Sequence, residues 1–343
     1  MKTIYSELHK LHHGNNELSM GKLLPCFEMP LRAELILERV KNQKLGDVIA
    51  PEDFGLEPIL RIHPQPFITF LENAWTEWAA LGRTNDALPI SWAVRGMNQT
   101  RAPEHIDGKL GFYSLDAGSP IQAGTWRAAY SSAQVALSGA RLVQSGERAA
   151  FALCRPPGHH AAADYLGGYC FLNNAAIAAQ SFLDAGATRV AILDVDYHHG
   201  NGTQAIFDAR ADVFVANIHG DPRMEYPYFL GYADEIGTGI GEGFNVNYPL
   251  PHGTEFAAWF ATLEEACKRI QAYAPDALIV SLGVDTFKDD PISQFKLESP
   301  DYFKIGARIA KLSKPTLFVM EGGYAVAEIG VNAVNVLEGF EDI

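Results

Sequence analysis

Metal-binding side chains gather in the stretch 194–198, which reads DVDYH. It follows the apolar run 189–193, and alternation along an extended segment puts Asp194, Asp196 and His198 on one side. Carboxylate and imidazole ligands suit Zn²⁺, with Fe²⁺ or Co²⁺ as alternatives. A turn with coincidental polar residues would leave these groups unpaired at a cost. The stretch therefore predicts a metal site, with Asp194 behind the metal as an acceptor for a histidine.

Asp285 is a candidate third ligand because it follows the apolar run 277–282. A single aspartate at the end of a strand is more often a helix cap or a turn residue. Together with Asp196 and His198, however, it would give three protein ligands and leave a position for water. That arrangement is typical of catalytic rather than structural zinc sites.

Two histidines and a tyrosine follow two further apolar runs, 149–153 and 316–320. His159 and His160 come after a stiff Pro-Pro-Gly turn, and histidine titrates near neutral pH. Tyr324 follows two glycines, and its hydroxyl could donate a hydrogen bond to a developing oxyanion. A metal, two histidines and a phenol together fit metal-assisted amide hydrolysis.

These side chains require a sheet that brings several strand ends together. The predicted strands are 3–5, 149–153, 189–193, 212–218, 277–282 and 316–320, and the predicted helices are 31–40, 67–81, 125–144, 173–183, 255–273, 301–312 and 328–337. Apolar strands alternating with helices favour an α/β fold with a doubly wound parallel sheet, in which ligands bind beyond the carboxyl ends of the strands. We expect a single domain over 1–343.

One stretch, 83–124, breaks this pattern because it is rich in glycine and proline and weakly periodic. A structureless segment of this length inside a compact domain is usually functional or disordered. We interpret it as an inserted loop near the site. A solvent-exposed excursion without a role is nearly as well supported by the sequence.

The composition of the chain limits which classes of partner it is expected to bind. The chain of 343 residues has 27 basic and 41 acidic residues and a net charge of −14, which disfavours nucleic acid and anionic membranes and tolerates a cationic substrate. No apolar run of about 18 residues is present, so no membrane span is expected. The four cysteines form no CxxC pair, and a reducing cytoplasm is the simplest expectation.

The motifs resemble those of the zinc-dependent deacetylases of the arginase/histone deacetylase superfamily. The matching stretches are 155–161, 167–174, 193–202, 282–291 and 321–324, in the family's order. The chain looks most similar to the bacterial acetylpolyamine amidohydrolases. That likeness rests on the long insert before 124–126 (GTW) and on the chain start, with Ser6, His9 and Lys10 ahead of 25–28 (PCFE) and 32–34 (RAE).

The resemblance implies a role for each candidate. The zinc ligands would be Asp196, His198 and Asp285. His160 would be the general base and acid, His159 an electrostatic partner that stays largely protonated, and Tyr324 the oxyanion donor. Asp194 would pair with the first histidine, and Asn201 lies behind the second, where many relatives have an aspartate.

The resemblance also implies how substrate is bound. Tyr169 and Tyr226 would form the aromatic walls of the channel, and Asp107 and Asp116 would meet the distal ammonium. A second glutamate expected nearby aligns with Gly118, which leaves the preferred polyamine length open. A structural K⁺ ion is implied around Asp194, Asp196 and His198, where Asn217 replaces the usual serine.

The expected function is zinc-dependent hydrolysis of a small cationic acetylated amine, such as acetylputrescine, acetylcadaverine or acetylspermidine. The resemblance also implies that the insert 83–124 helps form a homodimer, which narrows the active-site tunnel. An acetyl-lysine deacetylase acting on proteins or peptides is the alternative. A third hypothesis is a non-catalytic module that binds polyamines. Such a module would be expected to lack a metal ligand or Tyr324, and all of these residues are present.

Overall fold

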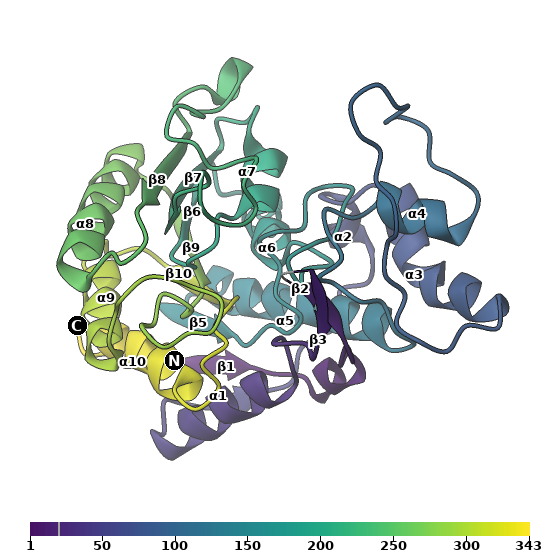
Figure 1. Ribbon diagram of the computed structural model, residues 1–343. Coiled ribbons are helices and arrows are strands. Elements are labelled where there is room, and N and C mark those ends of the chain that lie inside the picture. Colours follow the sequence, from purple (N-terminus) through teal and green to yellow (C-terminus); the bar gives the residue numbers. More distant parts are fainter. Residues whose placement is uncertain (20) are drawn as a thin grey trace.

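The computed structural model describes residues 1–19 and 21–343, and its centre is one sheet (Figure 1). Every neighbouring pair of its eight strands is parallel. From edge to edge the order is β4 (Val48–Ile49), β1 (Lys2–Ile4), β5 (Ala149–Ala152), β10 (Thr316–Met320), β9 (Ala277–Leu282), β6 (Val190–Asp194), β7 (Val213–Gly220) and β8 (Asn245–Leu250). The predicted α/β fold with a parallel sheet is confirmed.

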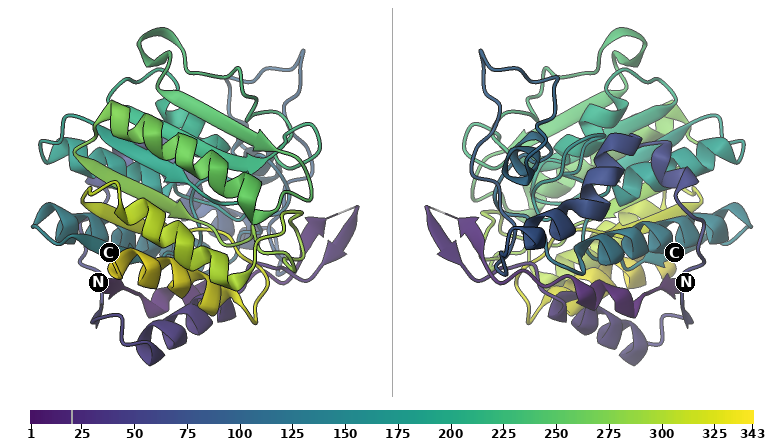
Figure 2. Two further views of the ribbon diagram at one scale, coloured as in Figure 1. Left: turned by 90° about the vertical axis from the view of Figure 1, so that its left-hand side faces the viewer. Right: turned by 90° about the vertical axis from the view of Figure 1, so that its right-hand side faces the viewer.

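Helices cover both faces of the sheet (Figure 2). One face carries α3 (Gln65–Ala80), α5 (Thr125–Gln144) and α6 (Asn174–Asp184), with the short α2 (Glu57–Leu60) and α7 (Asn201–Phe207). The other carries α1 (Leu31–Asn42), α8 (Phe256–Tyr273), α9 (Ser299–Ala310) and α10 (Ile329–Glu341). Alternate strand residues feed two cores, so Val319 packs on the first face and Phe318 on the second. Burial on both faces explains why the central strands are apolar at most positions.

All six predicted strands and all seven predicted helices occur, with ends that shift by a few residues. The sequence did not predict edge strands β4 and β8, the hairpin β2 (Glu17–Ser19) and β3 (Lys22–Leu24), helices α2, α4 and α7, or the 3₁₀ turns Glu7–Leu11 and Gly239–Gly241. Strand β8 reads NVNYPL, and its polar residues and proline hide the apolar signal that marks the central strands.

The insert 83–124 is not structureless. It contains helix α4 (Ile106–Phe112), which begins after His105, whose side chain accepts a hydrogen bond from the Asp107 backbone. Its ends are also tied down, because Ala87 pairs with Ile121 and Ser114 pairs with Leu166. The middle of the insert extends away from the sheet in Figure 1.

Within the described residues, every helix is too short or too polar to cross a bilayer.

Candidate active site

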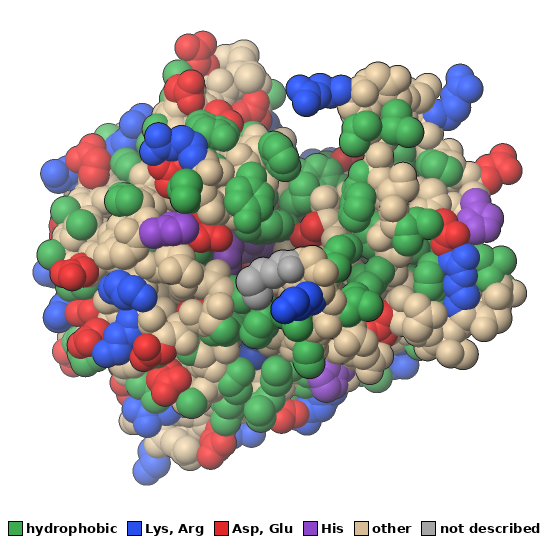
Figure 3. Space-filling view, viewed as in Figure 1, with side chains coloured by type: hydrophobic (Ala, Val, Ile, Leu, Met, Phe, Trp, Pro, Cys, Tyr) green, Lys and Arg blue, Asp and Glu red, His purple; other side chains and the backbone are tan. Residues whose placement is uncertain are grey.

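The predicted reactive side chains meet at one edge of the sheet. They follow β5, β10, β9 and β6, which are four consecutive neighbours in the strand order. Because the strands are parallel, their carboxyl ends lie together and the loops that follow them converge. Figure 3 shows a hollow near the middle of one face, with histidine visible in its depth and hydrophobic side chains around it.

Asp196, His198 and Asp285 form a cluster with the geometry of a metal site. Each offers a ligand atom, these atoms all lie within 4.8 Å of one another, and all three residues are buried. The His198 Nδ1 atom lies 2.9 Å from Asp285 Oδ2 and 3.5 Å from Asp196 Oδ1. The structure therefore brings the three predicted ligands together.

Backbone amides fix the orientation of both carboxylates. Asp285 Oδ1 accepts a hydrogen bond from the Tyr197 amide at 2.7 Å, and Asp196 Oδ2 accepts one from the Gly322 amide at 2.8 Å. A Cβ atom at Gly283 would lie 2.0 Å from Asp196 Oδ2, so only glycine fits there. Such outer contacts hold ligands in place before any ion binds.

The charges of the cluster fit a divalent cation. Burial and the nearby Asp196 carboxylate raise the pKa of Asp285 to about 8. Burial opposes a charge on His198, but hydrogen bonds and charge from Asp196 and Asp285 hold its pKa well above the usual range. A divalent cation would offset the repulsion between the two carboxylates that helps to raise the pKa of Asp285. Two carboxylates and one imidazole are also a donor set that zinc accepts.

The two adjacent histidines have different partners. His159 Nδ1 lies 3.0 Å from Asp194 Oδ2, whereas His160 Nδ1 lies 2.7 Å from the amide oxygen of Asn201. Burial disfavours the charged form of His159, but the Asp196 and Asp194 carboxylates outweigh it and raise its pKa to about 10. Burial, and then the charges of His159 and His198, hold the pKa of His160 well below the usual range. The two environments therefore favour opposite forms, the charged form for His159 and the neutral form for His160.

Tyr324 follows β10 and is held through its backbone. Its amide donates to Asp290 Oδ2 at 2.7 Å, and Asp290 also accepts from the Ala325 amide. The Arg32 guanidinium lies 4.6 Å from the centre of the Tyr324 ring. Asp290 was not among the predicted site residues, although it lies within the matching stretch 282–291.

Glu321 is a second residue that the sequence analysis did not single out. It is fully buried, and its Oε2 atom accepts hydrogen bonds from the Gly158 and His159 amides at 2.6 and 3.1 Å. Burial raises its pKa to about 7. Glu321 thus fixes the turn that carries both histidines, and its place directly after a predicted strand was the available signal.

The two expected wall tyrosines pack against different candidate catalytic residues. The Tyr169 ring packs edge-on against Tyr324, with centroids 5.4 Å apart, and the Tyr226 ring packs edge-on against His160 at 5.1 Å. Each phenol donates to a carboxylate: Tyr226 to Asp116 Oδ2 at 2.6 Å, and Tyr169 to Glu17 Oε1 at 2.9 Å. Glu17 stands alone in the sequence, and nothing in the pattern marked it.

Asp107 is not brought to this group in the single chain. Its carboxylate forms a two-pronged ion pair with Arg83, at the other end of the insert. Asp116, by contrast, lies at the wall, although its contacts are internal and it makes three hydrogen bonds within the protein.

Asn217 lies where the family resemblance places a side-chain ligand of a structural K⁺ ion. Its amide oxygen accepts from the Gly200 backbone at 3.1 Å, and its buried Nδ2 has no partner. The Asn217 oxygen therefore lies beside Gly200, and a Cβ atom at Gly200 would also meet the Asp194 carboxylate.

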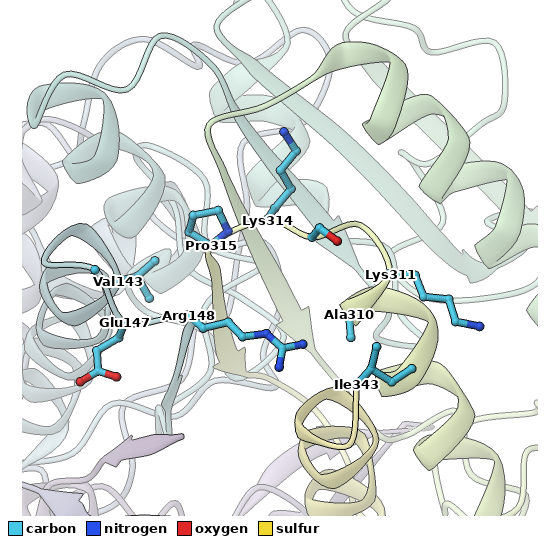
Figure 4. Close-up of a pocket in the computed structure, with 10 residues that line it drawn as sticks. Val143, Glu147, Arg148, Ala310, Lys311, Lys314, Pro315 and Ile343 are labelled. Carbon is cyan, nitrogen blue, oxygen red and sulfur yellow. The ribbon is translucent and has the colours of Figure 1, made fainter.

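A separate surface pocket of about 660 Å³ lies at the opposite end of the sheet, where β5 and β10 begin (Figure 4). Arg148 points into it, whereas Lys311 and Lys314 point away. Its cations do not converge, and it contains none of the predicted site residues.

Comparisons with known proteins find relatives that match this chain over nearly its whole length. Residues 26–340 match the family model described as the histone deacetylase domain. The chain is 66% identical over 343 residues to acetylpolyamine amidohydrolase 2 of Pseudomonas aeruginosa, covering 100% of this chain and 99% of that protein. It is 52% identical over 339 residues to the acetylpolyamine amidohydrolase of Mycoplana ramosa, covering 99% of each. The crystal structure of an acetylpolyamine aminohydrolase from Burkholderia pseudomallei superposes with a TM-score of 0.94 at 42% identity, covering 99% of this chain and 98% of that one.

Proposed function

Because this chain belongs to the histone deacetylase domain family, and within it to the acetylpolyamine amidohydrolases, we propose that it hydrolyses N-acetylated polyamines to acetate and the free amine. The family resemblance predicted from the motifs is confirmed. The single observation that carries the chemistry is the buried cluster of Asp196, His198 and Asp285 beside a neutral histidine. Substrates of the acetylputrescine, acetylcadaverine and acetylspermidine type are supported by the names of the relatives.

Asp196, His198 and Asp285 would hold the metal, with Zn²⁺ first and Fe²⁺ or Co²⁺ as alternatives. A cation held there polarises an amide carbonyl and lowers the pKa of bound water, which supplies a nucleophile at neutral pH. The donor set and its shared charge support this assignment.

The proton transfers are assigned to His160. The Asn201 oxygen accepts from Nδ1 of His160, so its other nitrogen is free to accept a proton from the attacking water. The same histidine then protonates the leaving amine. His159, charged and bonded to Asp194, stabilises negative charge nearby. The Tyr324 hydroxyl donates to the oxyanion as the carbonyl carbon becomes tetrahedral.

Acetate release tests this proposal directly. We would compare N-acetylputrescine, N-acetylcadaverine, N⁸-acetylspermidine and an acetyl-lysine peptide on zinc-loaded protein. Asp285→Ala should lose activity and bound zinc together, because it removes one of three ligands. The exposed neighbour Asp289→Ala is the matched control and should retain both.

The outcome also separates the alternatives. Turnover of the small amines and weak turnover of the peptide would support the polyamine reading. Preference for the peptide would favour a protein deacetylase with the same chemistry. Binding of acetylputrescine without acetate release, in a protein with full zinc content, would leave only a polyamine-binding module.

A homodimer formed through the insert 83–124 is part of the proposal. Ile90, Val94 and Met97 project from it with 76%, 59% and 58% of their surfaces exposed, which is unusual for apolar side chains clustered on one segment. A dimer would cover them, and Asp107 would then lie at the partner's channel. The mass in solution, compared with that of Ile90→Asp, tests the interface.

Three further expectations remain proposals. The four described cysteines are buried and unpaired, which supports a reducing compartment such as the cytoplasm, and the net charge of −14 argues against nucleic acid and anionic membranes as partners. A single domain over 1–343 is supported by a sheet whose strands run from Lys2 to Met320. A K⁺ ion near Asp194 is the third, and a rise in Tm with K⁺ but not with a larger cation would support it.

A further inference from the structure

The last part of the insert, residues 114–119, lies against the channel wall. Leu115 donates its amide to the Leu166 carbonyl at 2.7 Å, and Leu166 donates to the Tyr113 carbonyl at 2.8 Å. This short pairing sets the insert beside the turn that carries Tyr169. The two segments are about 50 residues apart in sequence, so the contact depends on the fold.

The backbone that carries Tyr169 is in an unfavourable conformation. Gly168 and Tyr169 have φ angles of 51° and 68°, and tyrosine rarely adopts a positive φ. At Gly168 a Cβ atom would lie 2.1 Å from the His160 ring, so the backbone passes directly against that histidine. A turn of this kind persists only when its surroundings hold it.

Two side chains of the insert hold that turn. Asp116 Oδ2 accepts from the Gly168 amide at 2.9 Å, and Ser119 Oγ accepts from the Tyr169 amide at 2.7 Å. Ser119 is 2% exposed. Both amides of the strained turn are therefore bonded to one short stretch of the insert.

The same Asp116 oxygen also accepts from the Tyr226 hydroxyl at 2.6 Å. Tyr226 packs on His160, whereas Tyr169 packs on Tyr324, so one carboxylate joins the two sides of the channel. Its other oxygen accepts from the Gly118 amide at 2.9 Å, which fixes the carboxylate plane. On the far side, Glu17 accepts from the Tyr169 hydroxyl and anchors that ring independently.

We propose that Asp116 is a positioning residue that sets the separation of Tyr169 and Tyr226, and so the width of the channel for the alkyl chain of the substrate. This rests on the proposed function of the site. The family resemblance implied instead that Asp116 contacts the substrate's distal ammonium. The two roles predict different substrate dependence. A residue that positions the channel wall affects every substrate that enters the channel, whereas a residue that contacts the ammonium affects only charged substrates.

The test compares N-acetylputrescine with N-butylacetamide, which has the same alkyl length and no ammonium. We expect Tyr226→Phe and Asp116→Ala each to lower kcat/KM about tenfold on both substrates, since each breaks the hydrogen bond from Tyr226 to the Asp116 carboxylate. The double variant should be no worse than Asp116→Ala alone, because both changes break the same link. Asp116→Asn should lose less than Asp116→Ala, because its amide oxygen can still accept from Tyr226 and Gly168.

Tyr130→Phe is the matched control. The Tyr130 hydroxyl donates to Asp53 at 2.5 Å on an exposed part of α5, so this change removes the same kind of bond away from the channel and should leave kinetics unchanged. Tyr226→Phe removes a single oxygen and keeps the test usable if Asp116→Ala unfolds. The positioning role would be overturned, in favour of ammonium binding, by two results together. Asp116→Asn would lower kcat/KM only on N-acetylputrescine, and Tyr226→Phe would leave kcat/KM unchanged on both substrates. Absence of turnover of both substrates by the unmodified protein would instead contradict the proposed function.

Discussion

The metal-ligand cluster and the channel wall are neighbours that are held in place in different ways. Asp196, His198 and Asp285 follow strands β6 and β9, which are paired along their lengths in the middle of the sheet. The wall residues Tyr169 and Tyr226 lie on loops. Their positions depend on side chains that bond to single backbone amides and phenols.

The difference shows where each part is vulnerable. The strand ladder supplies many hydrogen bonds to the backbone that leads into the cluster. The wall has few supports, of which Asp116 provides two and Glu17 and Ser119 one each. Changes at the cluster should therefore abolish chemistry, whereas changes at the wall should alter rate and selectivity by smaller factors.

The largest effect is expected at the oxyanion donor. Tyr324→Phe should lower kcat about 10²–10³-fold, the loss typical of one such donor, and leave the zinc content unchanged. Steady-state kinetics and metal analysis on the same sample measure both. Activity equal to that of the unmodified protein would contradict the role of Tyr324.

A smaller effect is expected at Asp290, which bonds to the Tyr324 amide. Asp290→Ala should lower kcat by roughly tenfold or more, because the phenol would no longer be held at the reacting carbonyl. Combined with Tyr324→Phe it should add little, since both changes act on one group. Fully additive losses would show that Asp290 acts elsewhere.

Glu17 makes the wall sensitive to pH. Burial raises its pKa to about 7 from an ordinary value of 4.5, although its bonds from Tyr169 and Phe27 favour the charged form and Asp116 and Glu28 oppose it. A raised carboxyl pKa means that the fold prefers the protonated form, so stability falls as pH rises from about 4.5 to 7. Glu17→Gln removes this dependence. We expect its Tm, relative to the unmodified protein, to improve by a few degrees between pH 5 and pH 8.

The control for that experiment is Glu52→Gln, an exposed carboxylate whose Tm difference should be flat over the same pH range. A flat difference for Glu17→Gln as well would mean that Glu17 titrates normally.

The smallest effect is expected at Asp107 and Arg83. Both side chains are partly exposed, at 26% and 31%, and ion pairs of that kind contribute little. Asp107→Asn should lower the free energy of unfolding by less than about 1 kcal/mol, and by less still in high salt. Urea unfolding at two salt concentrations measures this, and a loss above about 2 kcal/mol would mean that the pair is structurally more important than its exposure suggests.

The sequence by itself determined much of this protein. Mainly apolar runs marked the central strands, because a strand buried on both faces has few polar positions, and helical spacing marked the long helices. The residues directly after those runs were the ones brought together, since parallel strands place their carboxyl ends at one edge. Asp285 is the clearest case: alone it is an ordinary strand-end aspartate, yet it lies 2.9 Å from His198.

Only the tertiary structure decided the rest. The strand order β5-β10-β9-β6 is not the chain order, and it makes four separated motifs neighbours. The sequence could not predict where Glu17 and Asp116 lie. Their contacts with Tyr169 and Tyr226 join segments that are 152 and 110 residues apart. Local patterns record which face of an element is buried, but they carry no information about which distant loop will supply an acceptor. That choice is made when the sheet and its helices pack.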